Sequence, residues 1–234
     1  MKAIIKREFD AYFSSMLGYV FLAIFLLLTG SMFYLMNILT VSASMKNFFA
    51  QVNMWAIFIL PMLTMRMFSE DRKMKTDLLL MAAPISVTEI VLGKFFAAME
   101  VFLIGIIVTF FYPITLNLFG ILPVAETISC YVGFVLLCST IIAIGAFMSS
   151  LTESQIVAAV STYGILLLTI CLGTAASSIR NPFISSALLW LSPLQRFSSF
   201  TMGILDVESM VYYISLICLF LFFTIAVFEK RRFQ

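Results

Sequence analysis

Six stretches of the chain contain no charged side chain, and each is at least 19 residues long. A transmembrane α-helix needs about 20 predominantly apolar residues, whereas a strand of a membrane barrel has about 9–11 residues that alternate apolar with polar. These stretches are too long for strands and do not alternate, so the sequence predicts an all-α membrane protein with six transmembrane helices. The uncharged stretches are Ala11–Met45, Asn47–Met65, Val101–Ala125, Thr127–Thr152, Ser154–Ile179 and Ser209–Phe228.

Composition agrees with this fold class. Only 11% of the residues are charged and 62% are hydrophobic, whereas about 25% of a soluble domain is charged. We expect the spanning helices near residues 17–39, 52–67, 93–116, 128–148, 156–172 and 209–228 of a single membrane domain, 1–234. The longest connection is Gly173–Glu208, and its apolar composition predicts re-entrant or interfacial helices on the outer side of the membrane.

The basic residues predict the orientation of the chain. Eleven of the fourteen Lys and Arg residues fall within residues 2–7, 66–94 and 230–232. With six spans these three groups lie on the same side of the membrane, and cytoplasmic loops carry an excess of Lys and Arg. The sequence therefore predicts that the N- and C-termini are both cytoplasmic.

The residues before the first span form an amphipathic pattern. On a helix over Met1–Phe13, the apolar side chains gather on one face and the charged ones on the other. This pattern predicts an interface helix lying on the membrane surface; an ordinary flanking segment with positive charge is the alternative. The apolar face holds Met1, Ile4, Ile5, Phe9, Tyr12 and Phe13, and the charged face holds Lys2, Lys6, Arg7 and Asp10.

Several classes of function are disfavoured by what the sequence lacks. It has no histidine, its four cysteines lie in the apolar stretches without a CxxC pair, and it has no GxxxxGK[ST] phosphate-binding loop. We therefore expect a non-catalytic subunit that binds no metal or cofactor itself. Its net charge of +2 comes from residues that mark topology, so we expect no nucleic-acid partner.

The only long polar region inside the chain is Met65–Phe95. Glu70 and Asp71 favour the start of a short helix there. This helix leads through Asp77 to the apolar residues 78–81 and then to Pro84. Either the segment is a hairpin packed beneath the spans, or its apolar patch docks into a groove on a soluble partner.

Two capping boxes define the helix starts on this side. Ser86 and Glu89 form the first, which predicts a helix beginning near Val87 and continuing unbroken through Leu116. Thr152 and Gln155 form the second, at the predicted start of the fifth span, with Glu153 between them.

Glu100 is the one carboxylate expected inside the cytoplasmic boundary of the third span. Intramembrane carboxylates are functional hypotheses by default. It either pairs with Arg66 or Lys94 near the interface or forms a polar group at the inner mouth of a conduit.

The central polar region resembles ABC-2-type transporter permeases. In that family the segment commonly reads Arg-x-Phe/Leu-x-Glu-Glu, then Thr-Glu-Leu-Leu-Leu, Pro-Ile-Ser and Gly-Lys. Here the matching segment is Thr64–Phe95, TMRMFSEDRKMKTDLLLMAAPISVTEIVLGKF. Ser149–Val157 and the Leu205–Asp206 approach to the last span are also similar. The likeness covers nearly the whole chain and is closest to a compact subfamily with gliding-motility and nitrous-oxide-reductase-maturation permeases.

The resemblance implies the permease subunit of an ATP-driven exporter in the bacterial cytoplasmic membrane. It implies two separate ATPase subunits, which bind ATP-Mg, and a second permease copy or a paralogue. Residues 68–92 would be the cytoplasmic coupling region, Met1–Phe13 the interface helix and 173–208 the outer closing segment. The implied ATPase-docking residues are Glu70, Asp71, Lys73, Lys75, Asp77, Leu78, Leu79, Leu80 and Met81. Pro84, Ser86, Glu89 and Gly93 would set the geometry of the coupling region, and Thr152, Glu153 and Gln155 would form the second cytoplasmic loop.

One departure from the family pattern bears on the coupling helix. Lys73-Met74-Lys75 stands where a Lys-Ser-Gly or Lys-Thr-Gly turn is common, so we expect the helix to run on unbroken through this point. Three other functions remain as alternatives: a six-span channel or ion-coupled carrier, a membrane enzyme, and a structural anchor for an envelope machine.

Overall fold

The computed structural model of the chain describes residues 1–76, 86–119, 122–178, 189 and 192–232. These residues form helices and no strand. Six helical segments are long and apolar enough to cross a membrane, which confirms the predicted all-α, six-span fold. The spanning helices are α2 (Leu17–Phe33) with its π-helical extension η1 (Tyr34–Ile38), α3 (Lys46–Thr64), α6 (Val87–Thr109) with α7 (Phe111–Phe119), α8 (Val124–Leu151), α9 (Gln155–Ser178) and α12 (Val207–Arg232).

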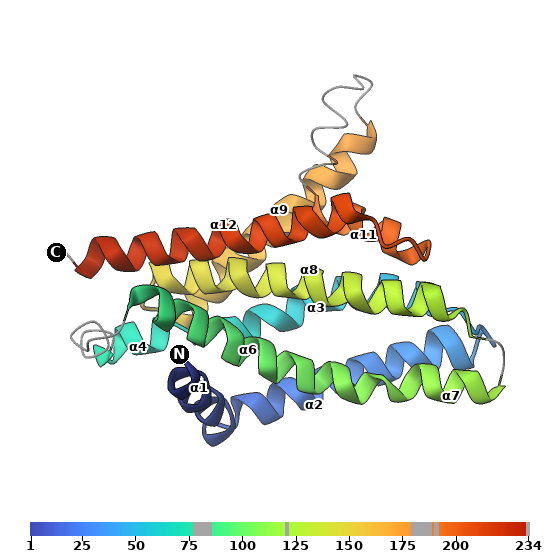
Figure 1. Cartoon of the computed structure of the whole chain (residues 1–234), viewed down its shortest axis with the longest axis horizontal. Coiled ribbons are helices and arrows are strands. Elements are labelled where there is room, and N and C mark those ends of the chain that lie inside the picture. Colours follow the sequence, from blue (N-terminus) through green and yellow to red (C-terminus); the bar gives the residue numbers. More distant parts are fainter. Residues whose placement is uncertain (77–85, 120–121, 179–188, 190–191, 233–234) are drawn as a thin grey trace.

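Helix α8 forms the centre of the bundle (Figure 1). In the most apolar 18-residue stretch of α8, 78% of the residues are buried. The corresponding share is 61% for α3 and for α6, and 22% for α2 and for α9. Helix α3 approaches α8 closely, because a Cβ atom on Gly145 would lie 2.1 Å from the Thr64 hydroxyl oxygen. Small residues at such crossings allow membrane helices to pack closely.

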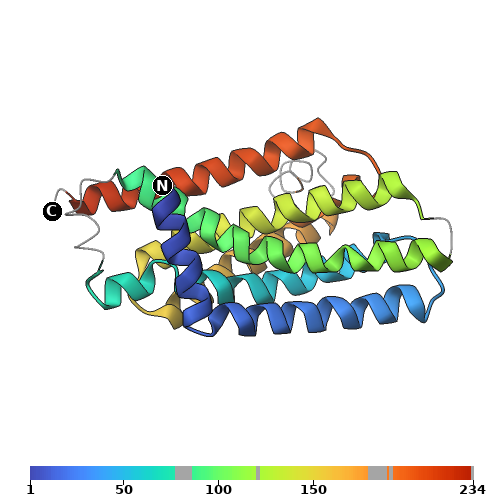
Figure 2. The same cartoon turned by 60° about the horizontal axis from the view of Figure 1, so that its bottom comes forward.

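The described elements of the predicted coupling region lie at one end of the bundle. Figures 1 and 2 show both termini, α1 (Lys2–Ser14), α4 (Ser69–Lys73) and the starts of α6 and α9 at this end, while α7 and α11 (Pro193–Thr201) lie at the other. Helix α1 crosses the ends of the spanning helices (Figure 2). It is joined to α2 by a sharp turn at Met16, whose φ of 59° is left-handed.

The predicted amphipathic pattern of α1 agrees with its packing. Ile4 and Tyr12 are buried and Ile5, Phe9 and Phe13 are partly buried against the core. Lys2, Lys6, Arg7 and Asp10 are exposed. The apolar face is therefore used for packing against the bundle.

Several predicted helix boundaries are wrong. Helix α3 begins at Lys46 rather than near residue 52, and α9 continues to Ser178 rather than ending near residue 172. The third span is not one unbroken helix, because α6 ends at Thr109 and α7 begins at Phe111. The short connections at the end of the bundle where α7 lies contain too little polar sequence to indicate where a helix stops.

The second predicted capping box is also misplaced. Helix α9 begins at Gln155, so the residue before it is Ser154 and not Thr152. Thr152 instead ends α8 with an extended backbone, and its hydroxyl oxygen accepts a hydrogen bond of 3.2 Å from the Ser154 amide. Thr152 therefore closes the turn between the two helices.

At the end of the bundle opposite α4, α11 packs against α8 and α12. Phe197 and Phe200 are buried, and a Cβ atom on Gly133 of α8 would lie 2.5 Å from the Phe200 ring. The Tyr213 hydroxyl donates a 2.5 Å hydrogen bond to the Pro193 carbonyl oxygen. Helix α11 lies in the segment Gly173–Glu208, for which re-entrant or interfacial helices were predicted, and the end of α9 also falls in that segment.

Candidate functional site: the charged junction of α1, α4 and α6

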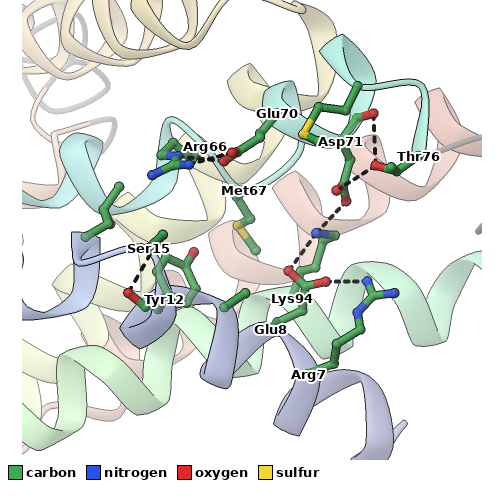
Figure 3. Close-up of a pocket in the computed structure, with 13 residues that line it drawn as sticks. Arg7, Glu8, Tyr12, Ser15, Arg66, Met67, Glu70, Asp71, Thr76 and Lys94 are labelled. Atoms are coloured by element: carbon green, nitrogen blue, oxygen red, sulfur yellow. Dashed lines mark hydrogen bonds and ion pairs between the residues drawn. The ribbon is translucent and has the colours of Figure 1, made fainter.

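A buried lysine joins three elements at the end of the bundle where the termini lie. The Lys94 side chain, on α6, is only 3% exposed. Its Nζ atom lies 2.8 Å from Glu8 Oε2 on α1 and 2.7 Å from Asp71 Oδ2 on α4 (Figure 3). We call Glu8, Asp71 and Lys94 the Lys94 clamp.

The chemistry of the clamp explains why a charge is tolerated there. A buried ammonium without partners is strongly destabilising, and pairing it with carboxylates offsets the lost hydration. The ring of Phe68 lies 5.5 Å from Lys94 Nζ and adds a cation–π contact. Since Glu8 and Asp71 come from different helices, the same ammonium fixes α1 and α4 against α6.

A glycine allows α1 to come close enough to α6 for the clamp to form. A Cβ atom on Gly93 would lie 2.8 Å from Ile4 Cγ2, which is closer than side-chain atoms normally approach. Ile4 therefore packs against the backbone of α6 one residue before Lys94. This gives Gly93 a structural role in the coupling region.

Helix α4 is short and acidic at its start. Glu70 and Asp71 lie in its first turn, as predicted from the sequence. Glu70 makes a bidentate pair with Arg66, with contacts of 2.6 Å to Nε and 2.5 Å to Nη2. Two of the predicted docking residues therefore face other parts of the same chain: Glu70 binds the end of α3, and Asp71 binds α6.

The expectation that this helix runs on unbroken is wrong. It ends at Lys73, and Lys75 takes a left-handed conformation with φ of 56°. The Lys75 amide donates a 3.2 Å hydrogen bond to the Arg72 carbonyl, and the Thr76 hydroxyl lies 3.0 Å from Asp71 Oδ1. Lys75 thus occupies a conformation that glycine usually provides at helix ends, at the position where glycine is common in the resembling family.

The turn into α4 is held on α8 by one hydroxyl group. Ser149 Oγ accepts hydrogen bonds from the Phe68 and Ser69 amides at 3.0 and 3.1 Å, and donates one of 3.2 Å to the Met65 carbonyl. The two amides would otherwise lack partners in a buried position, whereas the Met65 carbonyl also accepts a hydrogen bond from the Ser69 hydroxyl. Ser149 therefore joins the end of α3 and the start of α4 to α8.

Arg72 connects α4 to the second loop at this end. Its Nη1 donates a 2.7 Å hydrogen bond to the Leu151 carbonyl, and its Nε lies 3.1 Å from Glu153 Oε1. The Glu153 side chain is 63% exposed to solvent, so the ion pair alone contributes little to stability. The contact nevertheless brings the two predicted cytoplasmic loops together.

A cavity of about 600 Å³ lies between α1, α4 and α6. Tyr12 lines it and donates a 3.4 Å hydrogen bond to the Leu63 carbonyl. Burial, with a further contribution from the Glu8 carboxylate, raises the pKa of the Tyr12 hydroxyl well above its usual range. Tyr12 is therefore neutral at physiological pH and acts as a hydrogen-bond donor. The charged lining residues are Arg7, Glu8, Arg66, Glu70, Asp71 and Lys94 (Figure 3).

The first capping box forms in part. The Glu89 amide donates a 3.2 Å hydrogen bond to Ser86 Oγ, and α6 begins at Val87 as predicted. The Glu89 carboxylate does not complete the box among the described residues; it lies 3.9 Å from the amino group of Met1. This capping residue therefore also contacts the start of α1.

Glu100 does not pair with Arg66 or Lys94, because those cations bind Glu70 and the two clamp carboxylates. Glu100 is exposed on α6 and faces the basic side of α1 across a small hollow. The role predicted for it as the mouth of a conduit stays a prediction.

Some predicted docking residues fall outside the described part of the chain. They are Asp77, Leu78, Leu79, Leu80, Met81 and Pro84. Lys73 and Lys75 are described and exposed, and Met74 between them is 66% exposed. The described part of the predicted docking segment thus ends in three exposed residues, 73–75.

The sequence reasoning missed Glu8, Lys94 and Ser149 as members of this site. A signal for Glu8 was present, because it lies four residues from both Ile4 and Tyr12 and so shares their buried helical face. A carboxylate on a buried face indicates a buried cation elsewhere. Lys94 entered the prediction as one of the basic residues that mark topology and as a possible partner of Glu100, but not as a member of this site.

Comparison with known proteins agrees with this architecture. The family model described as ABC-2 family transporter protein matches residues 40–228, which include α4, Lys94 and Ser149. A search of the curated proteins finds no match to this chain. The matched region is most of the chain and holds four of its six apolar spanning segments in full and most of a fifth. The chain therefore belongs to the ABC-2 transporter family and is a multi-pass membrane permease component of an ABC transporter.

Proposed function

We propose that this permease is driven by separate ATPase subunits that dock on α4 and the residues that follow it, and that it works as an exporter in a bacterial cytoplasmic membrane. In this proposal the chain is not itself an enzyme and binds no cofactor. ATP-Mg binds to the partner subunits, and a second permease copy or a paralogue completes the membrane part. The family membership supports the association with ABC ATPases.

One observation carries the proposal: α4 is exposed on one side and bound to the bundle on the other. Lys73 at the end of α4 and Met74 and Lys75 after it are exposed, and Met74 also lines the cavity at its edge. Asp71 binds Lys94 on α6, and Arg72 binds Leu151 at the end of α8. A partner that moves the outward side would therefore move the ends of two spanning helices with it. Rigid-body movement of this kind is how ligand-driven proteins commonly switch between two states.

The orientation of the charge supports the side on which docking takes place. Residues 2–7, 66–94 and 230–232 hold most of the basic side chains, and α1, α4 and the C-terminal part of α12 lie at the same end of the bundle (Figure 1). Cytoplasmic surfaces carry this excess, and the ATPase subunits would find their ATP there.

Docking is tested by substituting an exposed methionine with aspartate. Met74→Asp places a charge at the exposed position directly after α4, where docking would bury it without a partner at a cost of well over 1.4 kcal/mol. We expect at least a tenfold loss of ATPase subunits co-purified with the tagged permease from native membranes. Leu79→Asp, in the segment whose sequence predicts the docking patch, should have the same effect.

Met202→Asp is the matched control. Met202 is 68% exposed, against 66% for Met74, and it lies beyond α11 at the other end of the bundle. It should leave co-purification unchanged. Capture of no ATPase subunit by the unsubstituted permease, or equal loss from both methionine variants, would contradict docking on α4.

A further inference from the structure

A second, smaller hollow lies between α1 and α6 on the outside of the junction. Its volume is about 280 Å³, and it is lined by Lys2, Ile5, Lys6, Phe9 and Glu100. The four α1 residues have the spacing of one helical face, i, i+3, i+4 and i+7. Lys2, Lys6 and Glu100 make no ion pair with another described residue. Two ammonium groups and one carboxylate in the lining of the hollow are therefore able to bind a charged ligand.

The hollow lies at the depth of a lipid headgroup. Glu100 is the last charged residue before the uncharged stretch Val101–Ala125. From Glu100 to Leu118, near the end of α7, the helical rise amounts to about 27 Å. The hydrocarbon core of a bilayer is about 30 Å thick, so Glu100 stands at one edge of it.

Helix α6 offers an apolar path that leads away from the hollow. Phe96, Leu103 and Ile107 are exposed, and with Glu100 they are spaced by four, three and four residues along one face of the helix. A carboxylate on such a face is costly next to hydrocarbon. Acyl chains lying along Leu103 and Ile107 would carry a headgroup directly to Glu100.

We propose that this hollow binds the headgroup of an ethanolamine phospholipid. Its phosphate would accept charge-assisted hydrogen bonds from the Lys2 and Lys6 ammonium groups. Its primary ammonium has three N–H donors, one or more of which would bind Glu100. An anionic glycerol headgroup brings no cation for Glu100 and sets a phosphate beside a carboxylate. A choline headgroup brings a cation without an N–H donor.

The lipid itself provides the first test, without any substitution. The purified, delipidated full-length permease is titrated with phosphatidylethanolamine, phosphatidylcholine and phosphatidylglycerol of identical acyl chains, and retained lipid is counted by native mass spectrometry. We expect phosphatidylethanolamine to be retained at least fivefold more than either of the others. Equal retention of all three, or preference for phosphatidylglycerol, would overturn the proposal.

Substitutions then assign the preference to the hollow. Glu100→Gln should remove the preference for phosphatidylethanolamine over phosphatidylcholine, and Lys2→Gln with Lys6→Gln should lower retention of all three lipids at least fivefold. The matched controls are Asp10→Asn, an exposed carboxylate on α1 outside the hollow, and Lys230→Gln, an exposed lysine near the end of α12. Both should bind like the unsubstituted protein.

A protein could occupy the same place instead. If the lipid-free permease is a dimer that Glu100→Gln dissociates, the hollow belongs to a contact between copies and the lipid proposal is wrong. Glu100→Gln retaining an unchanged headgroup preference would also refute it. Since Glu100 is exposed, unchanged thermal unfolding of the variant is the expected sign that the fold is intact.

Discussion

Lys94 is a full positive charge with 3% of its side chain exposed, at the point where three helices meet. Its hydration is replaced by two carboxylate oxygens at 2.7 and 2.8 Å and by the ring of Phe68. Both carboxylates are more exposed than the lysine, at 14% for Glu8 and 27% for Asp71. Removing one of the carboxylates is therefore expected to destabilise the lysine most, because water can replace the lost partner least easily at the least exposed group.

Replacing Lys94 tests the clamp directly. Lys94→Met keeps most of the side-chain volume but leaves Glu8 with Arg7 as its remaining cation, and Asp71 with none among the described residues. Breaking a fully buried ion pair costs about 3–5 kcal/mol, and the partial exposure of the carboxylates reduces this to about 2 kcal/mol. We expect a lower thermal unfolding midpoint in detergent, measured by fluorescence-detected size-exclusion chromatography.

The control for this prediction is Lys230→Met, which removes an exposed lysine. Adding Glu8→Gln and Asp71→Asn to Lys94→Met should recover part of the loss, because the repulsion between the carboxylates is then gone. A Lys94→Met variant as stable as Lys230→Met would show that the clamp does not hold the junction together.

Lys75 shows a different residue-scale feature, a strained backbone at an exposed position. A left-handed conformation costs an L-residue about 1–2 kcal/mol, and glycine avoids most of this cost. Lys75→Gly should therefore stabilise the protein by about 1 kcal/mol, which raises the unfolding midpoint of a protein of this size by about 2–4 °C.

Lys73→Gly is the matched control for Lys75, because it is an exposed lysine at the last position of α4 with helical geometry. Glycine there should destabilise the protein by about 0.5–1 kcal/mol. The two substitutions are thus expected to shift the midpoint in opposite directions, and shifts of the same sign would contradict the left-handed conformation of Lys75.

At the scale of elements, the packing of α1 on α6 depends on one missing side chain. Gly93→Val would place side-chain atoms where Ile4 packs, since even a Cβ atom would lie 2.8 Å from Ile4 Cγ2. We expect α1 to be displaced and the Glu8–Lys94 contact to be lost with it. The measurement is a lower thermal midpoint together with weaker capture of the ATPase subunits.

A second substitution makes this prediction specific to the contact. Ile4→Ala removes the atoms that clash and should restore much of the stability of Gly93→Val, whereas the effects of unrelated substitutions simply add. Gly164→Val is the control, because a Cβ atom on Gly164 of α9 would have no neighbour within 4 Å. Additive effects of Ile4→Ala and Gly93→Val would rule out the close approach.

Local sequence patterns predicted the elements better than the contacts between them. The start of α6 at Val87 and the acidic first turn of α4 follow from side chains within a few residues of each helix end. The clamp joins residues 86 positions apart along the chain. A local sequence pattern cannot predict a contact between residues so far apart in the chain. The carboxylate on the buried face of α1 indicates only that a cation lies somewhere opposite it.

At the scale of the whole molecule, six long uncharged stretches were enough to predict the six spans. Charged residues exclude a segment from hydrocarbon at a cost of several kcal/mol, so their spacing limits where helices can cross. The boundaries were less predictable, as the early start of α3 at Lys46 and the break between α6 and α7 show. Lys46 lies at a helix start, where a long side chain can reach the interface.

The orientation of the bundle can be tested by labelling single cysteines with a membrane-impermeant maleimide. Lys75→Cys, on α4's end of the bundle, should be labelled only after the membrane is permeabilised, because the basic residues predict that this end is cytoplasmic. Met202→Cys, at the other end, should be labelled in intact cells. Cys130 and Cys138 are buried and do not interfere; Cys171 and Cys218 are replaced by serine in the background.

Labelling of Lys75→Cys in intact cells would contradict the predicted orientation, because the predicted docking surface would then lie outside the cytoplasm. Fluorescent-protein fusions at both termini give an independent reading, because the two ends of the chain lie with α4 (Figure 1) and should report the same compartment.

The three attachments of α4 have a mechanical consequence. The segment is fixed through Asp71 to α6, through the amides of Phe68 and Ser69 to α8, and through Arg72 to the turn at Leu151. A body pinned at two points can still swing about the line that joins them. A third contact restricts that rotation as well, so we expect α4 to move with α6 and α8 rather than to turn on its own. A force applied to α4 by a partner should therefore tilt α6 and α8 together. Removing any one of the three contacts should let α4 rotate separately and weaken this transmission.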